Sequence, residues 1–92
     1  MPQVFKIGSY WIYLWTNEGK PLEPVHVHVA EGKPIESATK IWITRAGRVY
    51  LCNNNSHIPE HILRNIMRIV EARSSEIVSK WMSYFGEAEY FC

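Results

Sequence analysis

The stretch that decides the fold is Val25-His26-Val27-His28-Val29, which alternates strictly between aliphatic and imidazole side chains. A β-strand turns successive side chains to opposite faces of its sheet. An extended backbone here therefore puts three valines on one face and two histidines on the other. A pattern with a period of two residues predicts a strand, so we expect residues 25–29 to be one strand of a sheet.

Further β-forming runs lie on both sides of this strand, and turn-forming residues interrupt them. They predict strands at residues 4–7, 10–16, 40–44 and 48–52. Hairpin connections are expected at Gly8-Ser9 and at Arg45-Ala46-Gly47. Residues 10–15 are apolar on both faces, which favours a central position in the sheet.

The pattern changes after the polar residues 53–56. Pro59 fits the first position of a helix, because the N–H that proline lacks would have no partner there. Apolar residues then recur at helical spacing, namely Ile62, Leu63, Ile66, Met67, Ile69 and Val70. We therefore expect a helix that starts at Pro59.

A second helix is expected after a break at residues 72–75, where a serine is available as N-cap. Gly86 is a natural stop for it, and its apolar side is expected to hold Ile77, Val78, Trp81, Met82 and Phe85. One continuous helix over residues 59–85 is the alternative, because the two apolar stripes are nearly in register.

Together these elements predict one α+β domain over residues 1–92. An antiparallel sheet of about five strands, from about residue 4 to 52, comes first. Two C-terminal helices, from about residue 59 to 86, are expected to pack on one face of it, and residues 87–92 form a short tail.

The composition excludes several classes of protein. No apolar run reaches the roughly 18 residues that cross a bilayer, so no membrane partner is expected. Cys52 and Cys92 have the spacing of neither a disulfide framework nor a thiolate metal site, and the N-terminus has no signal-peptide pattern. We expect a cytoplasmic protein without a cofactor. No nucleophile motif or phosphate-binding glycine loop stands out, so the sequence leaves open whether the protein is an enzyme.

His26 and His28 are the candidate catalytic residues. Their rings are expected on the same face, about 7 Å apart along the strand. Two such imidazoles can share a metal ion, act as an acid/base pair near neutral pH, or contact a phosphate or a partner. The alternative is two half-exposed strand histidines with ordinary hydrogen bonds. Glu18 and Glu23 lie in the preceding loop and could pair with them.

Four arginines are the candidate nucleic-acid or partner-binding residues. Residues 40–80 carry seven basic and three acidic side chains, a net charge of +4 within a chain of net charge +1. Arg64 and Arg68 lie one turn apart on the expected helix, and Arg45 and Arg48 flank the expected hairpin. Arginines beside aromatic rings suit RNA or an acidic protein. A solvated surface is the alternative, and the sequence does not show whether the four share a face.

One set of residues along the chain matches a known family pattern. It consists of Met1-Pro2, Val4, Ile7, Asn17-Glu18, Pro24 to Val29, Trp42, Trp81 and Tyr84-Phe85-Gly86. In these residues the chain resembles the small bacterial proteins of domain-of-unknown-function family four-one-six-zero. The resemblance covers about residues 2–86 and is most specific in the histidine strand and in Trp81. The family usually has a second proline where this chain has Val25.

The resemblance implies that the protein is one of the two products of a two-gene bacterial unit similar to toxin–antitoxin pairs. The family has no established catalytic residues that could be assigned to this chain. We therefore expect a toxin–antitoxin-like component that binds a small protein encoded by a neighbouring gene, with RNA as a further expected ligand. One alternative is a structural interaction module that forms a homodimer or larger homo-oligomer. The other is a metal-binding protein that uses His26 and His28.

Overall fold

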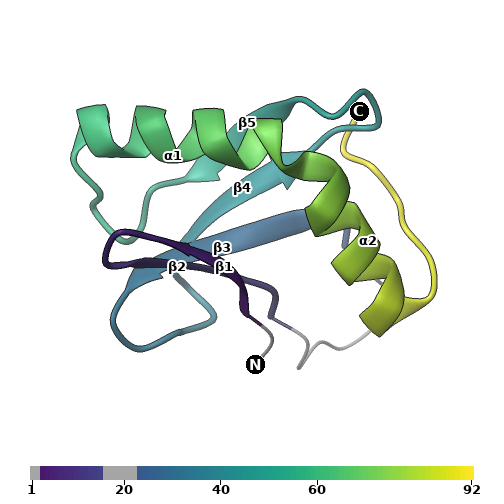
Figure 1. The fold of residues 1–92 in the computed structure, drawn as a ribbon, viewed down its shortest axis with the longest axis horizontal. Coiled ribbons are helices and arrows are strands. Elements are labelled where there is room, and N and C mark those ends of the chain that lie inside the picture. Colours follow the sequence, from purple (N-terminus) through teal and green to yellow (C-terminus); the bar gives the residue numbers. More distant parts are fainter. Residues whose placement is uncertain (1–2, 16–22) are drawn as a thin grey trace.

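The computed structural model describes residues 3–15 and 23–92, in which five strands precede two helices (Figure 1). The strands are β1 (Gln3–Ile7), β2 (Tyr10–Tyr13), β3 (His26–Glu31), β4 (Thr39–Ile43) and β5 (Val49–Asn53). The helices are α1 (Glu60–Ala72) and α2 (Ser74–Phe85). All neighbouring strands pair antiparallel in the order β1-β2-β3-β4-β5. The predicted α+β fold, a five-stranded antiparallel sheet followed by two helices, is confirmed.

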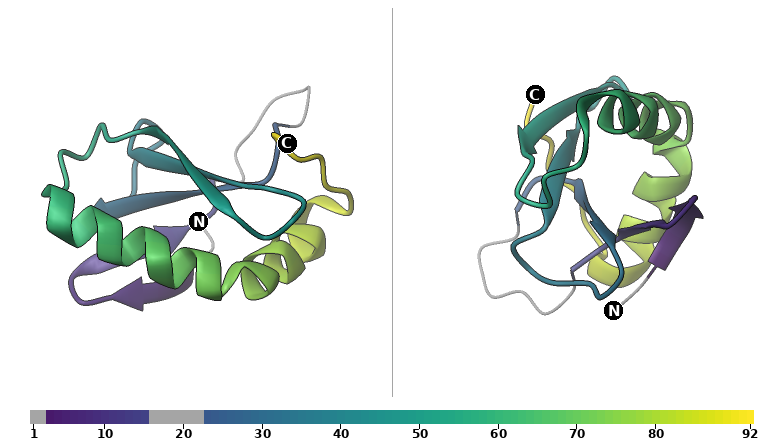
Figure 2. Two further views of the ribbon diagram at one scale, coloured as in Figure 1. Left: turned by 90° about the horizontal axis from the view of Figure 1, so that it is seen from above. Right: turned by 90° about the vertical axis from the view of Figure 1, so that its left-hand side faces the viewer.

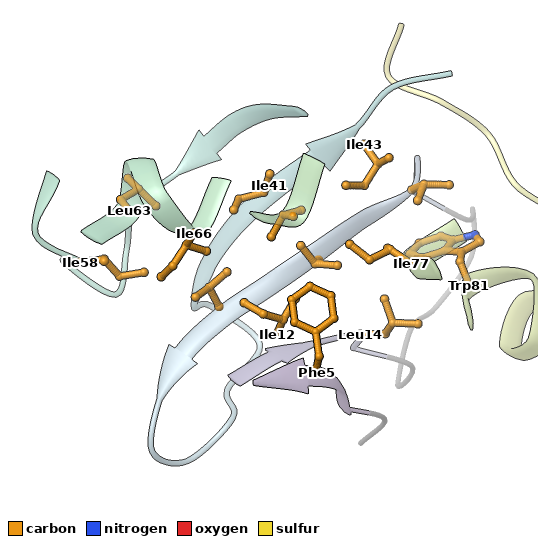
Figure 3. Packing of buried hydrophobic residues seen from close by; sticks show 14 residues of the cluster. Phe5, Ile12, Leu14, Ile41, Ile43, Ile58, Leu63, Ile66, Ile77 and Trp81 are labelled. Atoms are coloured by element: carbon orange, nitrogen blue, oxygen red, sulfur yellow. The ribbon is translucent and has the colours of Figure 1, made fainter. Parts of the chain in front are cut away.

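Both helices lie on one face of the sheet (Figure 2). The core forms between this face and the helices, where Ile12 and Ile41 of the sheet meet Ile66 of α1 and Ile77 of α2 (Figure 3). All four side chains have no measurable exposure. Aliphatic side chains removed from water in this way supply the main driving force for folding. The three valines predicted to share a face, Val25, Val27 and Val29, all belong to this core.

The strand around the two histidines is extended as predicted, although it begins one residue later, at His26, and continues to Glu31. Val25 lies directly before β3, where the strand begins. Its N–H donates to the carbonyl of Glu89 in the C-terminal tail at 2.8 Å, while its own carbonyl accepts from Ile43 N–H at 3.0 Å. The tail therefore supplies the partner that a neighbouring strand would otherwise provide.

The predicted strand over residues 10–16 is too long, because β2 ends at Tyr13, and residue 16 lies outside the described residues. β2 is the second strand, and β3 holds the middle position. Both faces of β2 are nevertheless covered, since Ile12 and Tyr13 point to opposite sides and are 0% and 1% exposed. An apolar pattern on both faces of a strand thus indicates that both faces are covered. It does not indicate which position the strand occupies in the sheet.

The helical region is two helices rather than the continuous alternative. The break is at Arg73, whose φ of −110° and ψ of 22° depart from the helical values. The predicted serine cap is wrong, because Arg73 occupies the N-cap position of α2 and no side chain among the described residues caps that end. Pro59 precedes α1 as its N-cap, with a ψ of 142°, so the helix begins at Glu60. The predicted stop is confirmed, since Gly86 has a φ of 76°.

Met82 was expected on the apolar side of α2 but is 42% exposed. One residue corresponds to about 100° around a helix. Trp81 points into the core and is 1% exposed, so its neighbour turns toward solvent. The inward positions of α2 are filled by Ile77 and Trp81.

The polar segment between β5 and α1 is fixed by side chains. The carboxamide oxygen of Asn54 accepts hydrogen bonds from Thr39 Oγ1 at 2.8 Å and from Ile58 N–H at 3.1 Å. Ser56 Oγ donates to the carbonyl of Val29 at 2.8 Å and accepts from Thr39 N–H at 3.0 Å. These bonds tie the segment to β3 and β4, and so set where α1 starts.

Candidate functional site

The sheet face opposite the helices carries both histidines. Residues that pair directly across antiparallel strands point to the same face. Tyr13 of β2 lies opposite His28 of β3, and His26 lies opposite Trp42 of β4. The predicted sharing of one face by the two imidazoles is therefore confirmed, and aromatic residues flank them on both sides.

These rings form a continuous histidine–aromatic row, defined as Tyr13, His28, His26, Trp42 and Phe91. Tyr13 stacks on His28 with ring centroids 5.7 Å apart. His28 meets His26 edge to face at 5.1 Å, and His26 meets Trp42 edge to face at 5.8 Å. Trp42 stacks on Phe91 at 5.2 Å with the ring planes within 4°. The row crosses β2, β3 and β4 and ends on the C-terminal tail.

Both histidines are buried, His26 at 2% and His28 at 5% exposure. The interpretation as half-exposed strand histidines is wrong in this respect, although the expected hydrogen bonds are present. His26 Nδ1 lies 2.8 Å from the carbonyl oxygen of Pro24, and His28 Nδ1 lies 3.3 Å from that of Ala38. A carbonyl oxygen can only accept, so each neutral ring carries its proton on Nδ1. Each Nε2 then keeps its lone pair.

Burial determines the charge of the pair. It lowers the pKa of His26 from its ordinary 6.5 to about 4, against the opposing effect of the Pro24 carbonyl. Burial also lowers the pKa of His28, because a low-dielectric surrounding disfavours the charged imidazolium. Both rings are neutral at pH 7. The predicted titration near neutral pH is therefore wrong for His26, and a catalytic role of the pair stays a prediction.

The metal hypothesis has two nitrogen donors, the Nε2 atoms of His26 and His28. Among residues 3–15 and 23–92, no group of three or more His, Cys, Asp or Glu side chains is arranged to hold a metal ion. Catalytic zinc sites use about three protein ligands and structural sites about four. The metal-binding hypothesis stays a prediction, which elemental analysis of the purified protein checks.

A charged pair lies beside the histidines. Lys40 is opposite His28 in the register, and its ammonium group pairs with the carboxylate of Glu23 and lies 4.5 Å from the centroid of the Trp42 ring. The hydrogen bond from Lys40 holds the pKa of Glu23 below its ordinary value. Glu23 thus pairs with lysine rather than with a histidine, and Glu18 lies outside the described residues. The sequence did not point to Lys40 as a site residue, because only the strand register shows that it lies opposite His28.

Trp81 joins the histidine–aromatic row to the helical layer. Its ring lies 5.3 Å from that of His26, centroid to centroid, and its Nε1–H donates to the carbonyl of Glu87 at 3.0 Å. Arg45 N–H donates to the carbonyl of Cys92 at 3.0 Å. The tail is therefore bound at both ends, which brings Phe91 onto Trp42.

The four predicted arginines are all exposed but fall into two groups. Arg45 and Arg48 line an open hollow of about 500 Å³ together with Tyr50, so the structure brings these three residues together. Arg64 and Arg68 lie on α1 and are not part of that lining.

Acidic side chains pair with some of these arginines. Arg64 pairs with Glu60 at 2.9 Å, and Arg48 Nε lies 3.1 Å from a carboxylate oxygen of Glu71. The basic middle of the sequence is thus partly neutralised on the folded surface.

This geometry defines a class of protein, a small α+β domain with a buried histidine pair on the sheet face opposite its helices. The chain belongs to the family described as Domain of unknown function (DUF4160), whose family model matches residues 9–82. The match contains the histidine strand and confirms the predicted family. No curated protein and no solved structure matches the chain. Within the described part of the chain, no helix has the length and apolar character needed to cross a membrane.

Proposed function

We propose that this protein is a cytoplasmic, toxin–antitoxin-like component that binds a small protein encoded by a neighbouring gene. The observation that carries the proposal is a patch of exposed apolar side chains at β5. Tyr50 and Phe91 are 52% and 54% exposed, and their rings are 6.4 Å apart. Leu51, 41% exposed, points to the opposite face of the same edge strand. Neighbouring exposed apolar groups on a small domain favour a protein-binding surface.

The buried histidines support a binding role rather than a catalytic one. Rings with 2% and 5% exposure are out of reach of a macromolecular substrate. Neutral His26 instead packs against Trp42, and Trp42 in turn supports Phe91 of the exposed patch. In this proposal the histidine–aromatic row is the scaffold, and the patch at β5 is the contact surface.

Co-expression with the neighbouring gene tests the proposal. We expect the two products to co-purify on a tag attached to this chain, and expect one of the two genes to change cell growth when expressed alone. Light scattering of this chain alone is the companion measurement. A homo-oligomer without co-purification would replace the proposal by the structural interaction module.

RNA is the second candidate ligand, favoured by the hollow that joins Arg45, Arg48 and Tyr50. Guanidinium groups beside an aromatic ring suit a phosphate and a stacked base. Any RNA phosphate must compete with Glu71 for Arg48. Filter binding of a labelled single-stranded RNA tests this candidate, with at least a tenfold loss expected for Arg45→Glu. Equal retention by wild type and variant would contradict it.

A further inference from the structure

Within the described part of the chain, the outer margin of β5 presents main-chain groups without a partner strand. There β5 pairs only with β4, so it ends the sheet on one side, as β1 does on the other (Figure 2). Ile43 N–H bonds to the carbonyl of Val25, the residue before β3, whereas Thr44 N–H bonds to the carbonyl of Arg48. Inward and outward groups alternate along an antiparallel strand. Val49, opposite Ile43, and Leu51, two residues later, therefore direct their N–H and C=O groups away from β4.

The two edge strands of the sheet differ in how they are protected from pairing with another chain. β1 carries the exposed Lys6 and an irregular register between Gln3 and Phe5. Lysines and bulges are devices that keep edge strands from pairing with other chains. β5 consists of Val49-Tyr50-Leu51-Cys52-Asn53, without a charged side chain. Its register shift comes only after Leu51, opposite the step from Lys40 to Ile41. The first three residues of β5 are thus open to pairing.

Positive charge lies at the start of this open margin. The Arg45 guanidinium lies over the ring of Tyr90, 5.0 Å from its centroid, and makes none of the salt bridges found among the described residues. The Arg48 side chain is 75% exposed even with Glu71 beside it. A strand placed along β5 would meet both arginines at the β4–β5 hairpin. A carboxylate at that end of the strand would complement them.

We propose that β5 receives an extended segment of the partner protein as an additional strand of the sheet, with an acidic residue at the end that lies against Arg45 and Arg48. This inference rests on the proposed function, because it identifies how that partner docks. Main-chain hydrogen bonds to Val49 and Leu51 hold the segment, as in other strand-addition complexes. Tyr50 on the histidine side of the sheet and Leu51 on the helix side select its alternating side chains.

Leu51→Pro is the central variant. It removes an N–H that points away from β4 and leaves the hydrogen bonds between β4 and β5 intact. An edge strand tolerates proline at a position whose N–H points outward. We expect at least a tenfold weaker affinity for the product of the neighbouring gene, with an unchanged unfolding midpoint. Leu51→Lys is a second variant that tests the same position if Leu51→Pro does not fold, and it should weaken binding by a similar factor. Met82→Lys is the matched control, since Met82 is 42% and Leu51 41% exposed, and it should bind like wild type.

The charge at the hairpin is tested separately. Arg45→Glu should weaken binding of the same partner at low salt, and the loss should shrink as salt screens the interaction. Lys33→Glu, at an exposed lysine in the turn after β3, is the matched charge-reversal control and should leave the affinity for the partner unchanged. Binding by Leu51→Pro and Leu51→Lys at the wild-type affinity would overturn the strand-addition inference while leaving the proposed function in place.

A second probe keeps the inference testable if the neighbouring product does not bind, which would refute the proposed function. This probe is a short synthetic peptide of alternating valine and threonine with two glutamates at one end, and the comparison peptide ends in two lysines. The acidic peptide should shift the amide resonances of Val49 and Leu51 in the labelled protein. The absence of such shifts would overturn the inference. A dimer of this chain that Leu51→Pro dissociates would overturn it too, because the occupant of β5 would then be a second copy.

Discussion

The two faces of the sheet both bury side chains but are built from different chemistry. Val27 and Ile41 on the helix side have no polar side-chain atoms and require only dense packing. His26, His28 and Tyr13 on the other side each carry a polar atom that must find a partner, and they find main-chain groups of Pro24, Ala38 and Ile35. The comparison teaches that burial of the aliphatic residues on the helix side depends on their volume, whereas burial of the histidines on the other side also depends on protonation.

Truncating the helix side should have the largest effect. Ile41→Ala leaves a cavity at a position with no exposure, and such changes cost about 2–5 kcal/mol of the free energy of unfolding. Ile35→Ala is the matched control, since Ile35 is 49% exposed and a surface change of this kind costs about 0.5 kcal/mol or less. Denaturant unfolding measures both. Equal losses would mean that the aliphatic core does not dominate stability.

Acid should destabilise the histidine side. The folded-state pKa of His26 is about 4 against an ordinary 6.5, so the folded state resists protonation. Its contribution to stability is fully present above about pH 6.5 and is lost as the pH falls toward and through 4. That difference corresponds to about 3 kcal/mol. The lowered pKa of His28 acts in the same direction. The free energy of unfolding, measured from pH 7 to pH 4, should fall accordingly.

The double variant His26→Phe with His28→Phe should flatten this pH dependence, because it removes both groups that resist protonation. Glu23 lies near both histidines, and its lowered pKa leaves an acid effect in the same direction. Tyr13→Phe is the control within the same row. It removes a hydroxyl whose pKa is raised above 10 by burial, so it should lower stability by a similar amount at every pH in this range. An unchanged slope in the double variant would contradict the assignment.

The helix side could be predicted from the sequence because its signals are local. The alternation of Val25 to Val29 and the helical spacing of Ile62, Ile66 and Val70 each describe one element at a time. Gly86 likewise stops α2 through its own backbone conformation. Such patterns need no knowledge of distant residues, and the fold class follows from them.

The histidine side could be predicted only in part. The shared face of His26 and His28 follows from alternation, but their burial depends on which residues cover that face. Phe91 is far along the chain and reaches the row through bonds between the tail and the strand ends. The register of β3 and β4 places Lys40 beside the histidines, where it pairs with Glu23. Both are long-range facts that no local pattern encodes.

The end of the histidine–aromatic row should contribute less than its middle. Phe91→Ala removes the stack on Trp42, and aromatic pairs of this kind contribute about 0.5–1.5 kcal/mol beyond buried area. Tyr84→Ala is the matched control, because Tyr84 is 53% and Phe91 54% exposed. Thermal unfolding followed by tryptophan fluorescence measures the loss and also the change around Trp42. A fluorescence spectrum identical to that of wild type would show that the stack does not form in solution.

The smallest effect is expected outside both faces, on the solvent side of α1. Arg64 and Glu60 form a pair one helical turn apart, and their side chains are 65% and 84% exposed. Such pairs stabilise a helix by about 0.2–0.5 kcal/mol and weaken with salt. Arg64→Ala should therefore lower the unfolding midpoint only slightly, and high salt should abolish the difference. A loss above about 1 kcal/mol would mean that charge on this helix is part of the stabilising framework, and stability could then no longer be assigned to the two sheet faces alone.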